Sequence, residues 1–283
     1  MKLPFKIDLS DKVVVITGAG GVLCSMFAEA AAVCGAKTAL LDLNGEAAES
    51  MAENIVKQGF VAKGYQCNAL QKESLETVHA KILADFGSCN ILINGAGGNN
   101  PRATTDKEYY ERGDIDASGI KSFFNLDAEG VGFVFDLNFM GTLLPTQVFA
   151  SDMVKKNAGT ILNISSMNAF TPLTKIPAYS GAKAAISNFT QWLAVHFAKS
   201  GIRVNAIAPG FFVTGQNRAL LYDENGNPTP RTGKILSATP MNRFGEPEEL
   251  IGTLLWLLSN EASAFVTGIV VPIDGGFSAY SGV

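Results

Sequence analysis

Short apolar runs alternate with longer helical stretches along almost the whole chain, and this alternation constrains the fold more than any other feature. Runs rich in β-branched residues predict buried strands at 13–16, 38–41, 91–93, 160–164, 204–207 and 269–271. Helical spacing of apolar residues marks the stretches between them, at 27–33, 46–57, 74–86, 133–154, 182–199 and 248–258. Strands that are apolar on both faces predict a parallel sheet covered by helices on both sides. We therefore predict a single α/β domain over residues 1–283, with a Rossmann-type doubly wound parallel sheet.

The stretch from Asn99 to Gly132 interrupts this alternation, because it is polar, aromatic and irregular. A connection of this length inside a compact domain is usually functional or mobile. We predict a substrate-side insertion at about 99–132. The sequence leaves open whether this insertion is a surface excursion or forms a wall or lid over an active site.

The composition argues against several classes of protein. The chain of 283 residues has a formal net charge of −4 and no basic stripe of the kind that binds nucleic acid. Its apolar stretches are too short to span a membrane, and Asp8 and Asp11 stand where a signal peptide needs an apolar core. We expect a cytoplasmic protein that binds neither nucleic acid nor membrane. Four scattered cysteines are expected to be free thiols, and no metal site is expected because His79 and His196 have no partner at ligand spacing.

A glycine-rich turn joins the first predicted strand to the first helix, in the string TGAGGVLC at 17–24. Glycine lets the backbone turn sharply and approach a pyrophosphate, and the positive end of the following helix stabilises the phosphate charge. The string NGAG at 94–97 follows a later strand and allows a cofactor to lie against the backbone. The residues predicted here to bind a cofactor are Gly18, Gly20, Gly21, Val22, Leu23, Asn94, Gly95, Ala96 and Gly97.

Asp42 ends the second predicted strand and bears on which dinucleotide the chain takes. A carboxylate at this strand tip can accept hydrogen bonds from both ribose hydroxyls of the adenosine. It would repel the 2′-phosphate of NADP, and no arginine stands beside it in the sequence. The sequence therefore predicts NAD (NADH) as the cofactor.

Tyr179 and Lys183 stand at i and i+4 near the start of a predicted helix, so they lie on one helix face. A tyrosine has a pKa near ~10 in water, and a neighbouring ammonium lowers that value by favouring the phenolate. Ser166 closes the preceding strand, where it could donate a hydrogen bond to a substrate carbonyl. Asn138 is a polar residue in an apolar helical stretch, where it either faces the surface or joins a buried polar network.

Asn138, Ser166, Tyr179 and Lys183, in that order, resemble the catalytic tetrad of the short-chain dehydrogenase/reductases. The resemblance covers the chain from about Leu9. Its other motifs are the glycine-rich turn, NGAG, NAIAPG at 205–210 with Thr214 after it, and DGG at 274–276.

The resemblance implies a mechanism. Tyr179 would exchange a proton with the substrate oxygen while a hydride moves to or from the nicotinamide carbon. Lys183 would lower the pKa of the tyrosine and hold the nicotinamide ribose. Ser166 would orient the carbonyl, and Asn138 would anchor a water that relays the proton. The further cofactor-binding residues that it implies are Asn68, Tyr179, Lys183, Pro209, Gly210, Val213 and Thr214.

The phosphate loop departs from the family pattern. The motif TGxxxGxG has glycines where Val22 and Cys24 stand in this chain. Gly18, Gly20 and Gly21 remain, so we expect the turn to form with shifted or altered phosphate contacts.

Longer strings are similar to one branch of the family, the D-mannonate oxidoreductases or fructuronate reductases, at 93–101, 163–180, 208–218 and 274–283. The similarity implies interconversion of D-fructuronate, a keto sugar acid, and D-mannonate, its hydroxy acid. A sugar acid needs a cation for its carboxylate and polar groups for its hydroxyls. The predicted substrate-binding residues are Asn99, Arg102, Ser166, Asn168, Lys175, Tyr179, Gln216 and Arg218.

Other functions stay open at this point. Another polyol or sugar-acid dehydrogenase, such as a gluconate 5-dehydrogenase, is the nearest alternative. A non-catalytic NAD-binding regulator and an NAD-dependent sugar epimerase, which also uses a Tyr-x-x-x-Lys pair, belong to different classes. Members of the family commonly form homotetramers, which the resemblance implies here. The apolar segment from Trp256 to Leu258 could serve an interface or the core.

Overall fold

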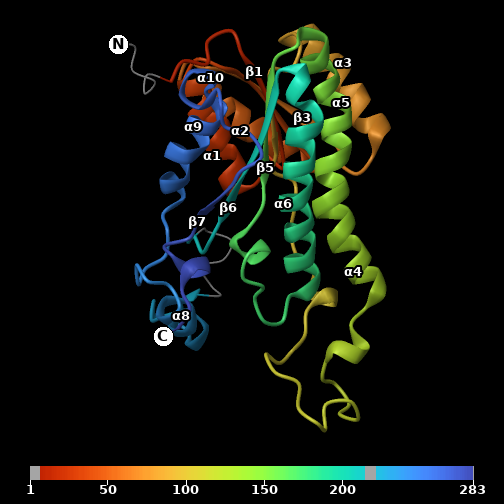
Figure 1. Cartoon of the computed structure of the whole chain (residues 1–283), viewed down its shortest axis with the longest axis vertical. Coiled ribbons are helices and arrows are strands. Elements are labelled where there is room, and N and C mark those ends of the chain that lie inside the picture. The colour runs from red at the N-terminus through yellow and green to blue at the C-terminus, as the bar shows by residue number, and fades with distance from the viewer. Residues whose placement is uncertain (1–6, 214–220, 283) are drawn as a thin grey trace.

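The computed structural model describes residues 7–213 and 221–282, and within these ranges seven parallel strands form one sheet (Figure 1). The strands lie in the order β3-β2-β1-β4-β5-β6-β7, and each neighbouring pair is parallel. The Rossmann-type doubly wound sheet predicted from the sequence is therefore confirmed. The strands are β1 (Val13–Thr17), β2 (Lys37–Asp42), β3 (Val61–Gln66), β4 (Ile91–Asn94), β5 (Gly159–Ile164), β6 (Ile202–Pro209) and β7 (Val270–Ile273).

Helices cover both faces of the sheet. One face packs against α1 (Val22–Val33), α2 (Gly45–Lys57) and α9 (Ile251–Leu258). The other face packs against α3 (Lys72–Asp85), α5 (Gly141–Lys156) and α6 (Pro177–Phe197). Shorter helices lie outside these layers, namely α4 (Ala128–Phe135), α8 (Pro230–Ser237) and α10 (Asn260–Ser263).

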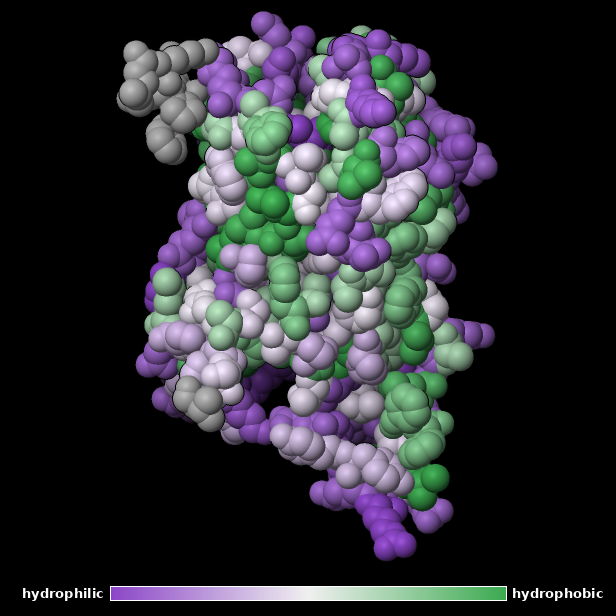
Figure 2. All heavy atoms as spheres, viewed as in Figure 1, coloured by the Kyte–Doolittle hydropathy of each residue, from purple (hydrophilic) through white to green (hydrophobic). Residues whose placement is uncertain are grey.

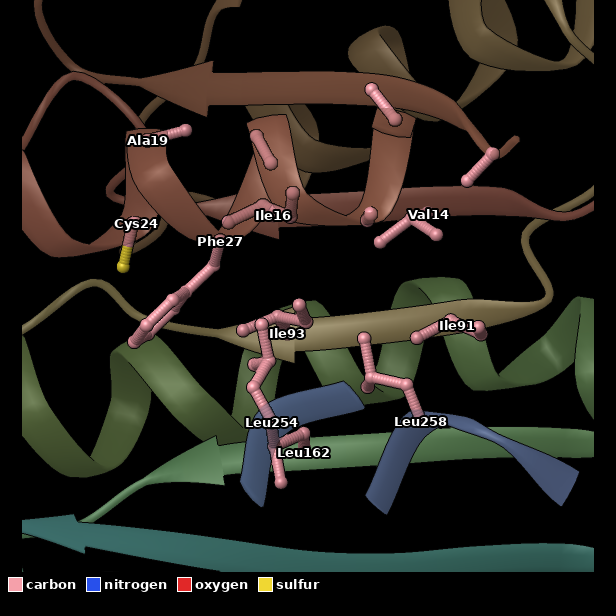
Figure 3. Packing of buried hydrophobic residues seen from close by; sticks show 14 of the residues in the cluster. Val14, Ile16, Ala19, Cys24, Phe27, Ile91, Ile93, Leu162, Leu254 and Leu258 are labelled. Carbon is pink, nitrogen blue, oxygen red and sulfur yellow. The ribbon is translucent and has the colours of Figure 1, made fainter. Parts of the chain in front are cut away.

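The core follows from the alternation of side chains along each strand. Figure 3 shows Ile16 of β1 and Ile93 of β4 on the face that meets Phe27 of α1 and Leu254 of α9. Val15 lies in the cluster on the opposite face, because successive strand residues point to opposite sides. Both faces are buried, and each large apolar side chain removed from water contributes about 1.5–3 kcal/mol.

The sequence does not predict three of the elements, namely β3, α8 and α10. β3 is an edge strand whose residues are mostly exposed or half-buried, so its string VAKGYQ lacks the apolar run of the inner strands. The helices α8 and α10 are short and carry too few turns to show a clear period.

The Trp256–Leu258 segment belongs to the core, since Leu257 and Leu258 are buried against α1 and the sheet.

The helix predicted over 133–154 is interrupted. It begins earlier, as α4, passes through a π turn at Asp136–Met140, and continues as α5. The π turn contains Asn138, whose side chain is fully buried.

The insertion before α4 projects beyond the carboxyl ends of the strands, as Figure 1 shows in yellow. Its backbone is tied to the loop before α6 by Thr105, whose N–H donates to the Lys175 carbonyl at 2.8 Å. An ion pair of 2.8 Å between Glu108 and Lys234 joins it to α8. The insertion therefore lies at the end of the sheet where parallel folds place their ligands. No helix in the described ranges has the length and apolar character of a membrane span.

Candidate active site

The carboxyl ends of β1 and β4 lie side by side, and the chain leaves them toward opposite edges of the sheet. This is the switch point at which doubly wound folds bind their cofactors. Thr17 ends β1, and its hydroxyl accepts hydrogen bonds from the N–H groups of Gly95 at 3.1 Å and Ala96 at 3.2 Å. Gly18 follows with a φ of +69°, and a side chain there would meet the Ala96 backbone. Glycine is therefore required at the start of the turn.

Cys24 explains how the turn forms without the family's last glycine. Its side chain is buried and points toward the end of β4 (Figure 3). A Cβ added to Gly95 would overlap the Cys24 sulfur, so the absent side chain of Gly95 provides the space that the thiol fills. Burial raises the pKa of this thiol to about 12, which keeps it neutral. Val22, the other residue that stands where the family motif has a glycine, is the first residue of α1 and is partly exposed.

Asp42 lies at the tip of β2 beside the turn. Its Oδ2 accepts the N–H of Gly20 at 2.9 Å, and its Oδ1 accepts the N–H of Asn44 at 2.9 Å. A carboxylate has about four acceptor positions, so both oxygens keep capacity for further hydrogen bonds. The carboxylate thus holds the glycine-rich turn against the start of α2 and can still bind hydroxyl groups.

A cavity of about 920 Å³ opens at this switch point. It contains most of the predicted cofactor-binding residues, namely Gly18, Gly20, Gly21, Val22, Leu23, Asp42, Asn68, Gly95, Ala96, Gly97, Pro209 and Gly210. Val213 instead packs beside a small apolar cluster with Leu221, and Thr214 lies outside the described residues. The sequence did not predict the apolar lining residues Phe133, Leu137, Phe211 and Phe212. Phe211 and Phe212 lie within the string 208–218, but only the fold shows that they line the cavity.

Asn94 turns away from the cavity. Its Nδ2 donates to Thr146 at 2.9 Å and to Asn163 at 2.8 Å, and Asn163 in turn donates to Thr190 at 2.9 Å. These buried side chains link β4 and β5 to α5 and α6. The sequence predicts that Asn94 binds the cofactor, but it does not line the cavity. Its side chain instead joins the sheet to the helices that cover it.

Asn138 occupies the π turn and reaches the loop after β4. Its Nδ2 donates to the Gly98 carbonyl at 2.7 Å and to the Val134 carbonyl at 2.8 Å, and its Oδ1 accepts the Gly98 N–H at 3.3 Å. The neighbouring Gly97 has no Cβ, and one added there would lie 2.7 Å from the Asn138 Oδ1 and 3.1 Å from the Lys183 Nζ. Two of the four candidate catalytic residues therefore converge on Gly97, in the cavity wall.

The other two candidates complete this group. The Lys183 ammonium donates to the Ile164 carbonyl at 2.8 Å and lies 5.6 Å from the centre of the Tyr179 ring. Ser166 lies just beyond β5 and is hydrogen-bonded to the Tyr179 side chain. The fold thus brings all four predicted catalytic residues to one place.

The electrostatics differ in part from the expectation for this pair. Burial raises the pKa of Tyr179, and the hydrogen bond from Ser166 opposes that effect. Burial also lowers the pKa of Lys183, to about 8. The interaction that lowers the pKa of Tyr179, and so favours its phenolate form, is therefore the hydrogen bond from Ser166 rather than the charge of Lys183. The buried lysine holds its proton less firmly than one in water, because burial penalises its charge.

The predicted substrate residues separate into several environments. Arg102 is held by Asp127 and Glu129, at 2.7 and 2.8 Å, and its guanidinium is committed to these two carboxylates. Asn99 donates to Thr104 at 3.2 Å within the insertion. The remaining predicted residues are Ser166 and Tyr179 in the catalytic group, Asn168 buried nearby, Lys175 at a second cavity, and Gln216 and Arg218 outside the described residues.

This group of residues can carry out proton transfer beside a cavity of dinucleotide size. Tyr179 has an exchangeable proton, Ser166 can donate to an oxygen, and Lys183 can hold hydroxyl groups. The sequence pattern of the short chain dehydrogenases matches residues 12–225.

Known proteins resemble the chain over nearly its full length. An uncharacterized oxidoreductase of Haemophilus influenzae is 61% identical over 276 residues, which cover 98% of this chain and 96% of that protein. The uncharacterized oxidoreductase UxuB of Bacillus subtilis is 50% identical, over 99% and 100% of the two chains. A crystal structure from Haemophilus, provisionally assigned as a D-mannonate oxidoreductase with bound NAD, is 60% identical and superposes with a TM-score of 0.94 over 100% of both chains.

Proposed function

We propose that this chain, which belongs to the short-chain dehydrogenase/reductase family of oxidoreductases, uses NAD to interconvert a keto sugar acid and its hydroxy acid. The pair that we propose is D-fructuronate and D-mannonate. The observation that carries the proposal is the convergence of Tyr179, Ser166 and Lys183 beside the cavity at the switch point.

The cavity fits NAD on three counts. Its volume of about 920 Å³ suits a dinucleotide, and the glycine-rich turn presents backbone at the start of α1, where a pyrophosphate is stabilised. Asp42 would accept the adenosine ribose hydroxyls and would repel a 2′-phosphate. The related Haemophilus structure contains NAD. When bound, NAD supplies the site that gives or takes the hydride.

The chain's own residues would manage the proton and the orientation. Tyr179 would give its phenolic proton to the carbonyl oxygen during reduction and take it back during oxidation. Ser166 would donate a hydrogen bond to the same oxygen and hold it beside the tyrosine. The ammonium of Lys183 would bind the ribose next to the nicotinamide. Asn138 would hold the loop around Gly98 that borders the site.

The sugar-acid substrate class has two supports. The Haemophilus protein provisionally assigned as a D-mannonate oxidoreductase is 60% identical. A second cavity beside the first carries more positive than negative side chains, as an anionic substrate requires.

A screen of NADH oxidation tests the proposal, with fructuronate, tagaturonate, 5-ketogluconate and neutral ketoses as substrates. We expect fructuronate to be reduced fastest and NADPH to be a poor replacement. Tyr179→Phe should lower kcat/KM by at least about 100-fold, the lower range for a general acid–base group. Tyr65→Phe, which removes a hydroxyl bonded to Asp85 away from both cavities, is the matched control. Turnover of neutral ketoses alone would refute the substrate class, and fastest turnover of 5-ketogluconate would favour a gluconate 5-dehydrogenase.

We also propose that the enzyme is a homotetramer. The outer face of α6 exposes apolar and aromatic side chains, with Val195 80% and Trp192 56% exposed. Trp192 stacks on His196 with ring centres 4.6 Å apart. Exposed apolar groups gathered in this way favour contact with another copy of the chain. The mass of the protein in solution tests this, and a monomeric mass would contradict it.

A further inference from the structure

A second cavity, of about 490 Å³, lies between the insertion, the loop before α6 and α8. Figure 2 shows the surface hollowed at this end of the molecule, just above the polar insertion. Phe211 lines both this cavity and the large cofactor cavity, so the two are neighbours. Its ring packs against Phe277 with centres 5.4 Å apart, and Phe277 also lines the second cavity. A molecule bound in the large cavity can therefore extend past Phe211 into this second space.

More positive than negative side chains line the cavity. Glu108, Lys175, Arg231 and Lys234 line it. Lys234 donates to Glu108 at 2.8 Å, so their charges compensate each other. The pKa of Glu108 is lowered chiefly by this hydrogen bond, and the charge of Lys175 acts in the same direction. Apart from this longer-range attraction of Lys175 to Glu108, neither Lys175 nor Arg231 forms an ion pair with a carboxylate within residues 7–213 and 221–282. Two positive charges therefore remain uncompensated in the cavity.

Both of these cations stand in unfavourable places. Lys175 has a φ of +72°, a left-handed conformation that costs a non-glycine residue about 1–2 kcal/mol. Its carbonyl accepts the Thr105 N–H at 2.8 Å, which fixes the strained backbone to the insertion. Arg231 lies in the first turn of α8, where the helix dipole disfavours a cation. Backbone strain of the kind found at Lys175 is common at ligand sites.

We propose that Arg231 and Lys175 bind the carboxylate of the sugar-acid substrate in this second cavity. The inference rests on the proposed function and adds the residues that select an acid over a neutral sugar. In a six-carbon keto acid reduced at the carbon next to its terminal CH₂OH, the carboxylate lies near the opposite end of the chain. The reacting carbonyl can then meet Tyr179 while the carboxylate extends past Phe211. Arg231 would bind both carboxylate oxygens through its planar guanidinium, and Lys175 would add a point charge.

Two variants test the site without disturbing the catalytic group. Arg231→Gln removes one cation at an exposed helix position. Lys175→Asn removes the other, and asparagine tolerates the left-handed backbone. We expect each to raise KM for fructuronate about ten- to hundredfold, as for the loss of a charge-assisted hydrogen bond. The kcat, the turnover of neutral ketoses and the Kd of NADH should stay within about threefold in both variants.

Controls separate this effect from a general change of charge. Lys199→Gln removes an exposed cation in the turn just after the C-terminal end of α6 and should leave KM for fructuronate unchanged. Arg231→Lys keeps the charge but not the planar fork, so its KM should lie between those of wild type and Arg231→Gln.

The outcomes distinguish the carboxylate site from the proposed function. If sugar acids are reduced and neither variant changes KM, the carboxylate site is wrong and the proposed function stands. If no sugar acid is reduced, the proposed function fails, and calorimetric titration with gluconate in the presence of NADH decides the site. Binding that is lost in Arg231→Gln and kept in Lys199→Gln would support it. Equal binding in both variants, or none to wild type, would overturn it.

Discussion

Asn138 and Gly98 exchange a pair of hydrogen bonds, in which the asparagine amide pairs with the backbone of the glycine as a neighbouring strand would. Nδ2 donates to the Gly98 carbonyl at 2.7 Å, and the Gly98 N–H donates to Oδ1 at 3.3 Å. The same Nδ2 donates to the Val134 carbonyl at 2.8 Å, in the last turn of α4 before the π turn. One buried side chain therefore stabilises both the break in the helix and the loop after β4.

Asn138→Ala should weaken both stability and catalysis. The substitution removes three hydrogen bonds of the Asn138 side chain, two to the half-buried backbone of Gly98 and one to the Val134 carbonyl, which costs about 1–3 kcal/mol in the free energy of unfolding. We also expect kcat to fall at least about tenfold, because the loop that borders the site loses its support. Urea denaturation and steady-state rates measure the two effects. Gln58→Ala, which removes an exposed amide hydrogen bond to Glu29, should change neither by a comparable amount.

Asp42→Asn should relax the preference for NADH. The amide keeps an acceptor for the Gly20 N–H but loses the charge that repels a 2′-phosphate. Because like charges in contact cost several kcal/mol, we expect the ratio of kcat/KM for NADH to that for NADPH to fall at least about tenfold. A ratio that stays the same in the variant would show that another residue sets the preference.

Gly95→Ala should destabilise the protein, and Cys24→Gly should partly restore it. The added methyl group would overlap the Cys24 sulfur and approach the Thr17 carbonyl to 2.8 Å, and overpacking of this kind costs about 1–3 kcal/mol. Removing the thiol relieves the first clash only. A double-mutant cycle on the free energy of unfolding should give a favourable coupling of at least about 0.5 kcal/mol. Additive effects would mean that the two residues do not share this space.

Lys183 should make the stability of the cofactor-free protein depend on pH in the alkaline range. Its pKa is about 8 in the folded protein and returns to its ordinary value on unfolding. Between about pH 8 and the ordinary lysine pKa near ~10.4, the unfolded chain binds the extra proton, so rising pH favours folding. Relative to Lys183→Met, the wild type should gain up to about 3 kcal/mol across this range, measured by urea denaturation. A flat difference would contradict the buried, weakly protonated lysine.

Six of the seven described strands, the glycine-rich turn and the candidate catalytic group follow from the sequence because each has a local signal. Tyr179 and Lys183 are fixed by helical spacing, and Ser166 by its place at a strand end. Long-range relations have no such signal. The partners of Arg102 stand about 25 residues further along in an irregular segment, so its ion pairs are not visible in the pattern.

The same limit applies to packing and to strand edges. That Cys24 fills the space above Gly95 is a matter of volume across two strand ends, which a motif comparison records only as a missing glycine. The edge strand β3 shows little hydrophobic pattern because one of its edges has no neighbouring strand in the described sheet. Arg231, on the unpredicted α8, is a candidate ligand only once the fold places that helix beside Lys175.

The π turn at Asp136–Met140 has a consequence for how the chain tolerates changes of length. A π turn accommodates about one residue more than an α-helical turn, and each residue of a helix corresponds to a rotation of about 100°. Deleting one residue there would return the turn to α-helical form and leave the orientation of α4 about the axis of α5 nearly unchanged, because the π turn takes up the extra residue within a single turn. The deletion would instead remove the backbone geometry that directs Asn138 to Gly98. The length of this helix can therefore change by one residue without turning the insertion, whereas the position of Asn138 depends on the π turn itself.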